Sequence, residues 1–179
     1  MSHGSLEHSD SNAEAQATTD APIVPKTLVE QAVEQVKEKF ETAIEDIKKH
    51  VGETTVYIKR ENIADVCRFL RDDPNFQFNL LSDLTGVDRG IEEDPRFEVV
   101  YHLTSLPKRT RLRLKVRVSE EDCHVPTVVE VWPTANWHER ETFDLMGIRF
   151  DGHPDLRKIL TPEDLEGHPL RKDFPLRGY

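Results

Sequence analysis

Two runs of strictly alternating side chains constrain the fold of this chain more than any other feature of its sequence. Residues 97–103 (FEVVYHL) and 112–118 (LRLKVRV) each place an apolar side chain at every second position. A period of two residues is that of a β-strand with one buried face. A loop containing Pro107 joins the runs. The two runs therefore predict a β-hairpin with one face packed against a core.

The opposite face of the second run is a ladder of cations: Arg111, Arg113, Lys115 and Arg117. Three interpretations of this ladder are open. It could be a solvated face whose charges discourage aggregation, a docking surface for an acidic partner, or a surface for nucleic acid. The net charge of −10 opposes the nucleic-acid interpretation, and it also opposes binding to anionic membranes.

The first 25 residues contain four acidic side chains, no Lys or Arg, and almost no large apolar side chain. This composition predicts a disordered acidic segment over residues 1–25. A secretory signal requires a basic start and an apolar stretch, and a mitochondrial presequence requires arginines and few acids. We therefore expect the chain to stay in the compartment where it is made. No apolar run approaches the roughly 20 residues of a membrane span.

Residues 26–150 predict a two-layer α+β domain with helices on one face of a mixed β-sheet. Between Val29 and Ile47 apolar residues recur at helical spacings, which predicts one long amphipathic helix that ends at Gly52. The stretch VPTVVEVWP at 125–133 fits either a short helix or a strand. The other elements expected before the hairpin are strands at 54–59 and 76–84, a helix at 63–70 and a turn at 85–90.

Residues 151–179 differ in texture from the rest of the chain. They hold four prolines and three glycines, which excludes a long helix or a central strand. Apolar side chains such as Leu156, Leu165 and Phe174 recur along the segment, whereas a disordered linker normally lacks such anchors. A proline-stiffened chain with spaced anchors predicts an extended arm that wraps another protein and becomes ordered only with it.

The segment WHERETFDLMG at residues 137–147 concentrates three acids, an arginine and a histidine. A zinc-protease helix requires His-Glu-x-x-His, but residue 142 is a threonine. Cys67 and Cys123 are too few for a disulfide framework or for the four ligands of an ordinary iron–sulfur cluster. Glu139 and Glu141 would point to different sides of a helix, which does not suit an acid–base pair. We therefore expect no catalytic, cofactor-binding or metal-binding residue in this chain.

Drawn as a helix, the same segment has two apolar sides. Trp137, Glu141 and Asp144 fall on one side, and further apolar residues fall on the other. This pattern predicts a helix covered twice, by its own core and by a partner. A buried carboxylate needs a partner, so we expect a buried network in which Arg140 pairs with Asp144 and Glu141 meets a cation. The alternative is an ordinary solvated helix with ion pairs between successive turns.

The order and spacing of these residues resemble the signature of the 30 kDa subunit family of respiratory complex I, the NADH-quinone oxidoreductase. The flanking WPTANW, the tail GHPLRKDFPLRGY and LTGVD at 84–88 are also similar to that family. The resemblance covers roughly residues 30–179 and is strongest from residue 124 onward. The family-motif and interface residues that it predicts are Glu139, Arg140, Glu141, Asp144, His153, Arg157, Ile159 and Leu160.

The resemblance implies an α+β domain over residues 26–150 and an extended C-terminal arm over residues 151–179 that wraps the neighbouring 49 kDa subunit of the peripheral arm. It implies that this chain binds no cofactor, while the whole complex passes electrons from NADH through FMN and iron–sulfur clusters to quinone, coupled to proton translocation. It also implies a peripheral position on the cytoplasmic face of the bacterial inner membrane, reached only through the complex. The alternative is the equivalent subunit of a membrane-bound hydrogenase or of another quinone- or ferredoxin-linked complex.

Overall fold

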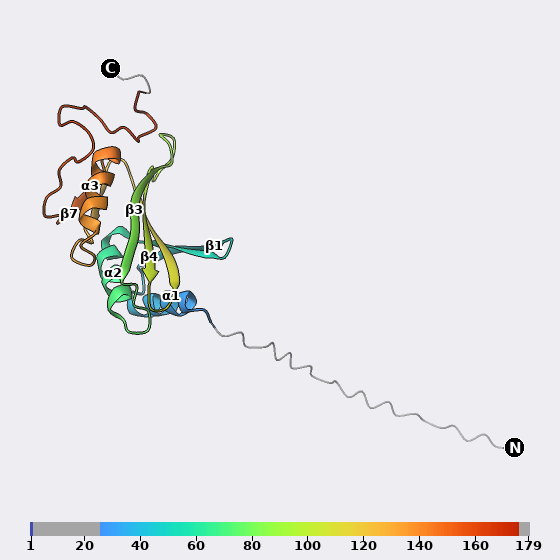
Figure 1. The fold of residues 1–179 in the computed structure, drawn as a ribbon. Helices are drawn as coiled ribbons and strands as arrows, with labels where there is room; N and C mark the ends of the chain where they lie inside the picture. Colours follow the sequence, from blue (N-terminus) through green and yellow to red (C-terminus); the bar gives the residue numbers. More distant parts are fainter. Residues whose placement is uncertain (2–25, 176–179) are drawn as a thin grey trace.

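The computed structural model describes residue 1 and residues 26–175 of the chain (Figure 1). Apart from Met1, the predicted disordered segment over residues 1–25 lies outside the described residues, as does the end of the predicted arm after residue 175. The elements are α1 (Leu28–Lys39), β1 (Ile44–His50), β2 (Glu53–Ile58), a 3-10 turn η1 (Arg60–Asn62), α2 (Ile63–Asp72), β3 (Leu80–Asp88), β4 (Phe97–Ser105), β5 (Thr110–Val118), β6 (His124–Pro126), α3 (Ala135–Met146) and β7 (Arg149–Asp151).

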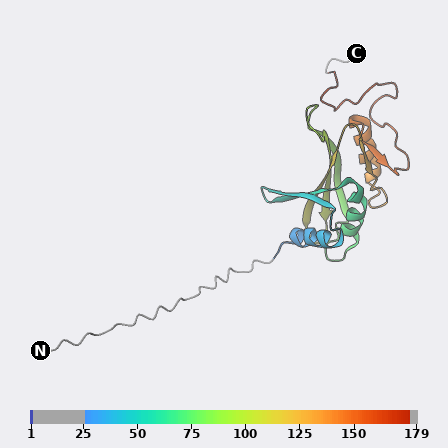
Figure 2. The ribbon, with the colours of Figure 1, turned by 180° about the vertical axis from the view of Figure 1, so that it is seen from behind.

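Five strands form one mixed sheet in the order β1-β2-β5-β4-β3 (Figures 1 and 2). Strands β4 and β5 pair antiparallel along their whole length, from Phe97 opposite Val118 to Ser105 opposite Thr110. The predicted hairpin is therefore confirmed. Strand β2 pairs parallel with β5, whereas the pairs β1–β2 and β3–β4 are antiparallel. Strands β6 and β7 form a separate short parallel pair.

The hydrophobic core lies between the sheet and its helices. Val33 of α1 and Leu70 of α2 belong to one buried cluster with Val56 of β2, Leu114 of β5 and Tyr101 of β4. The alternating apolar residues of the hairpin point into this cluster, because successive side chains of a strand point to opposite faces. The prediction of a two-layer α+β domain with helices on a mixed sheet is confirmed.

The predicted long helix is wrong in its second half. A capping box between Thr27 and Glu30 begins α1, and the helix ends at Lys39. The chain then forms β1, in which Ile47 lies opposite Val56 of β2. A spacing of four residues puts two side chains on the same side of either a helix or a strand. The apolar pattern after residue 40 therefore could not distinguish the two, and pairing with β2 decided in favour of a strand.

The start and end of β3 also differ from the prediction. The strand includes most of the stretch expected to turn, and Gly86 lies inside it opposite Val99. A Cβ atom on Gly86 would come within 3.1 Å of side-chain atoms of Met146 and Thr142 in α3. The glycine therefore serves the close approach of a helix to a strand. The turn comes later, in the connection from β3 to β4.

The stretch at 125–133 is neither one helix nor one strand. Its first residues belong to β6, and the chain then turns into α3 with Val128 and Val131 buried. Within residues 26–175, no helix is long and apolar enough to cross a membrane.

Candidate functional site

The motif residues meet along α3 and along the chain that follows it. Helix α3 lies beside β3 (Figure 1) and buries Ala135, Glu139, Thr142 and Met146. These positions recur every three or four residues, so they form the side of the helix that faces the sheet. The segment after β7, residues 152–175, contains no helix or strand and passes back over α3 to the connection between β3 and β4 (Figure 1).

Glu139 holds α3 to the chain that precedes it. Its side chain is fully buried, and one carboxylate oxygen accepts a hydrogen bond from the backbone N–H of Val128 at 2.7 Å. The other oxygen accepts a hydrogen bond from the Thr127 hydroxyl. Among the described residues no cation pairs with Glu139. Burial raises the pKa of Glu139 to about 7, although both hydrogen bonds act in the opposite direction. A carboxyl in this setting takes up a proton near neutral pH.

Asp144 holds α3 to the chain that follows it. Its carboxylate is fully buried, and one oxygen accepts three successive backbone N–H groups, from Ile159 at 2.9 Å, Leu160 at 2.7 Å and Thr161 at 3.0 Å. The other oxygen accepts the Thr161 hydroxyl. Burial alone would raise the pKa of Asp144, but these hydrogen bonds outweigh it and lower the pKa to about 2. The ionised carboxylate therefore sits in a nest of backbone donors.

The C-terminal segment also closes the end of α3. The last carbonyls of a helix have no partner within it. The carbonyls of residues 144–146 accept hydrogen bonds from His168 Nδ1 at 2.9 Å, the Leu170 N–H at 3.0 Å and Arg171 Nε at 2.7 Å, in that order. Gly147 ends the helix with a φ of 75°, and a Cβ there would collide with His168 and Arg171. Only glycine combines this backbone conformation with the space that the cap needs.

His153, Arg140 and Arg157 add contacts at the other end of α3. His153 Nδ1 accepts the N–H of Asp155 at 3.0 Å, so its Nε2 carries the proton and donates to the carbonyl of Asn136 at 3.2 Å. Arg157 forms a two-pronged pair with Asp155, with both N···O distances at 2.7 Å. Its carbonyl accepts a hydrogen bond from Arg140 Nε at 3.2 Å. These contacts bind the C-terminal segment along the length of the helix.

A buried ion-pair network lies at Arg96, which the sequence interpretation did not single out. The guanidinium is 3% exposed and contacts Asp88 at 2.8 Å, Glu120 at 2.8 Å and Asp173 at 2.7 Å. The hydrogen bonds to Asp88 and Asp173 raise the pKa of Arg96. The hydrogen bond from Arg96 is the main reason that the pKa of Asp88 falls to about 2. The four residues are far apart in the sequence, so no local pattern could have indicated the network.

The ion pairs predicted for α3 are therefore wrong in their members. Within the described chain Arg140 makes no ion pair with Asp144, and its guanidinium instead stacks 5.0 Å from the Trp137 ring. Glu141 is exposed and has no partner there, and Trp137 is 62% exposed. The buried acids of the helix are Glu139 and Asp144, and each is satisfied by N–H and hydroxyl donors. Several such donors can stabilise a carboxylate without a cation.

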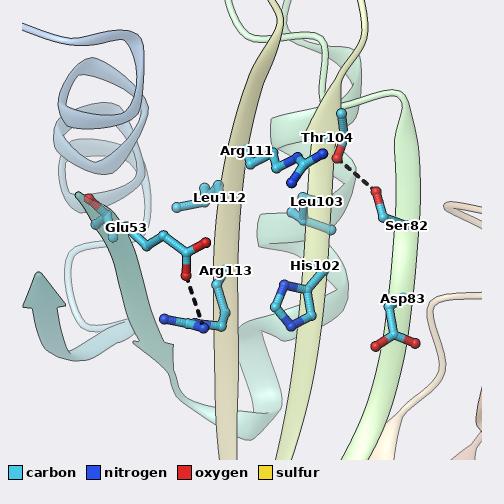
Figure 3. A pocket seen from close by; sticks show the side chains of 10 residues that line it. Glu53, Ser82, Asp83, His102, Leu103, Thr104, Arg111, Leu112 and Arg113 are labelled. Atoms are coloured by element: carbon cyan, nitrogen blue, oxygen red, sulfur yellow. Dashed lines mark hydrogen bonds and ion pairs between the residues drawn. The ribbon is translucent and has the colours of Figure 1, made fainter. Parts of the chain in front are cut away.

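The cation ladder on β5 is largely neutralised within the chain. Arg113 lies 3.2 Å from Glu53, Lys115 lies 2.6 Å from Glu98, and Arg117 lies 3.3 Å from Glu45. Arg111 is exposed and, in the described part of the chain, has no ion-pair partner. It lines a groove of about 440 Å³ on the open face of the sheet, where His102 lies between Arg113 and Asp83 (Figure 3). The internal pairs favour the solvated interpretation of the ladder, and docking of an acidic partner there stays a prediction.

The cysteines and histidines do not form a cluster. Cys67 is buried in the core and Cys123 is half-buried, and neither forms a disulfide. His124 faces two carboxylates, at Asp122 and Asp151. Across residue 1 and residues 26–175, no group of three or more His, Cys, Asp or Glu side chains is placed to hold a metal ion.

A small α+β domain whose motif side chains bind one segment of the chain to another has the properties of a structural subunit. Residues 56–179 match the family described as "Respiratory-chain NADH dehydrogenase, 30 Kd subunit", and the chain belongs to this family. Over 147 residues it is 52% identical to the matching NADH-quinone oxidoreductase subunit of Geobacter sulfurreducens, an alignment that covers 82% of this chain and 90% of the relative. The predicted resemblance is thereby confirmed.

Two solved structures support the same assignment. The trypsin-resistant fragment (1-134) of Nqo5 is 36% identical with a TM-score of 0.58, and the match covers 73% of this chain and all of that one. A chain of the membrane-bound sulfane sulfur reductase, an archaeal respiratory membrane complex, is 27% identical with a TM-score of 0.66. That match covers 83% of this chain and 86% of the other. The chain is thus one subunit of a multi-subunit respiratory assembly.

Proposed function

We propose that this chain is a non-catalytic structural subunit in the peripheral arm of NADH:quinone oxidoreductase, complex I. The complex transfers electrons from NADH through FMN and iron–sulfur clusters to quinone and couples this transfer to proton translocation. One observation carries the non-catalytic role. The buried acids of the motif, Glu139 and Asp144, spend their hydrogen-bonding capacity on the chain's own backbone and hydroxyl groups. A general acid or base must instead reach a substrate.

We further propose that residues 151–179 contact the neighbouring 49 kDa subunit. The inner side of this segment is held by α3 and by Arg96. Its outer side exposes Leu160 and Leu170, which are 61% and 58% accessible. Anchoring the segment in advance reduces the conformational entropy lost when a partner binds. That the segment becomes ordered only with its partner stays a prediction.

The proposed location is the cytoplasmic face of the bacterial inner membrane, held there through the other subunits of the complex. The absence of a membrane-crossing helix within residues 26–175 is compatible with this location. A related complex, such as a membrane-bound hydrogenase, is the second candidate. The identity of 52% to an NADH-quinone oxidoreductase subunit, against 27% to a sulfane sulfur reductase chain, favours complex I.

Purification of the tagged chain from gently solubilised membranes tests the assignment. We expect an NADH-binding flavoprotein and the 49 kDa subunit to purify with it. Deletion of the gene should abolish NADH-quinone activity of the membranes. Purification with a nickel–iron hydrogenase, and without an NADH-binding flavoprotein, would favour the second candidate and refute the first.

A further inference from the structure

The outer side of α3 carries a stripe of exposed side chains. Trp137 and Glu141 are one helical turn apart, and Asp144 continues the same row one turn further on. The backbone of Leu160 covers Asp144 through a hydrogen bond of 2.7 Å, while its side chain is 61% exposed. The stripe therefore runs from Trp137 past Arg140 and Glu141 to Leu160. We call these four residues the outer stripe.

The composition of the outer stripe is unusual for a solvated helix face. Its tryptophan is 62% exposed, and Arg140 stacks on the ring instead of pairing with an acid. Trp and Arg are the residues that most often dominate binding energy at the centre of protein interfaces. Among the motif residues named above, Glu141 is the one acid for which the described chain supplies no partner. The stripe thus combines a large apolar side chain with an uncompensated negative charge.

Two occupants from the chain itself fit this charge poorly. The N-terminal residues 1–25 contain four acids and neither Lys nor Arg, so they would bring negative charge to Glu141. A second copy joined by a two-fold axis would place the two outer stripes against each other. It would thus bring Glu141 towards its own copy, while Arg140 stays engaged with Trp137 and the Arg157 carbonyl. Like charges that face each other across an interface disfavour association.

We propose that the outer stripe docks on a neighbouring subunit that presents a Lys or Arg to Glu141 and an apolar recess to Trp137. This inference rests on the proposed function, because it names the surface through which the chain enters its complex. Leu160 extends the contact onto the C-terminal segment, so helix and segment form one continuous docking surface. Asp144 is essential to this surface without touching the partner, since it keeps Leu160 in place beside the helix.

The test compares Trp137→Ala, Glu141→Lys and Glu141→Gln with the matched control Glu38→Lys, which makes the same charge change at an exposed position of α1. Each full-length variant replaces the wild-type chain in cells, and the chain present in the assembled complex is measured by native gel. We expect Trp137→Ala and Glu141→Lys each to weaken incorporation about tenfold or more, Glu141→Gln to have a smaller effect, and Glu38→Lys to have none. Thermal melting of the isolated variants should match the wild type, since Trp137 and Glu141 are exposed.

The outcomes separate this inference from the proposed function. If the wild-type chain purifies with the NADH-binding flavoprotein and the Trp137 and Glu141 variants assemble as it does, the docking surface is refuted and the proposed function stands. An equal loss with Glu38→Lys would also refute it, because the effect would then follow net charge alone. Sedimentation of the isolated wild-type chain as a dimer that Glu141→Lys alters would assign the stripe to a second copy instead. If the wild-type chain enters no such complex, the proposed function itself fails.

Discussion

Replacement of Glu139 by glutamine tests whether α3 is held to the preceding turn by an uncharged carboxyl. The glutamine side chain has nearly the same shape, and its carbonyl oxygen can accept the Val128 N–H that Glu139 accepts at 2.7 Å. Its amide group can donate to the Thr127 hydroxyl. The substitution therefore keeps the packing and both contacts, and it removes only the ability to ionise.

The expected effect on stability has a definite sign and pH window. The folded state raises the pKa of Glu139 from its ordinary value of 4.5 to about 7. Its contribution to the free energy of unfolding is fully present below about pH 4.5 and is lost as the pH rises through about 7. The difference between the two pKa values corresponds to roughly 3 kcal/mol, at about 1.4 kcal/mol for each pH unit. Since small domains unfold at about 5–15 kcal/mol, this loss is large enough to measure.

Urea unfolding of the isolated chain at a series of pH values between 4 and 9 measures this quantity. We expect the stability of Glu139→Gln relative to the wild type to rise by roughly 3 kcal/mol between pH 5 and pH 8 and to level off above that. Glu141→Gln on the same helix is the control, and its difference from the wild type should not vary with pH. A difference for Glu139→Gln that is equally flat would refute the reasoning, because Glu139 would then be ionised in the fold.

The remaining predictions concern the attachments of α3. Asp144→Ala should speed trypsin cleavage within residues 152–175 severalfold, and wild-type stability should fall as the pH drops from about 4 towards 2, where this depressed pKa is titrated. Gly147→Ala should lower the unfolding free energy by about 1–3 kcal/mol in urea, because alanine is strained at a φ of 75°. Arg96→Ala should cost about 3–5 kcal/mol in the same assay, since it leaves buried carboxylates unpaired. Arg140→Ala should lower the amount of complex on a native gel while NADH-quinone turnover per flavin stays near normal.

The parts of the fold that the sequence predicts correctly are those with a strong local period. The β4–β5 hairpin follows from alternation, and α2 follows from the spacing of Ile63, Val66 and Leu70. The end of α1 was missed because Ala43 and Ile47 satisfy the spacing of a helix and of a strand equally well. Only pairing with β2, a contact between separate elements, distinguishes the two.

The candidate site was predicted in part for a related reason. A helical wheel gives the directions of side chains relative to one another, but it does not say which side faces the sheet. Glu141 was therefore expected to need a buried partner, whereas Glu139 is the acid that α3 buries against the domain. The donors to Asp144 are backbone N–H groups of residues 159–161, and no residue type announces them. Arg96 was missed because its three carboxylates come from distant parts of the chain.

The three acids of α3 explain why the motif resembles an active site without being one. On a helix, positions 139, 141 and 144 point in three widely separated directions, at about 100° per residue. Glu139 faces the turn before the helix, and Asp144 faces the segment after it. Glu141 faces outward, where we propose a partner. Acids that share a substrate must converge, whereas these diverge. Their divergence lets one short helix join the preceding turn, the C-terminal segment and a neighbouring subunit, which is the work of a scaffold.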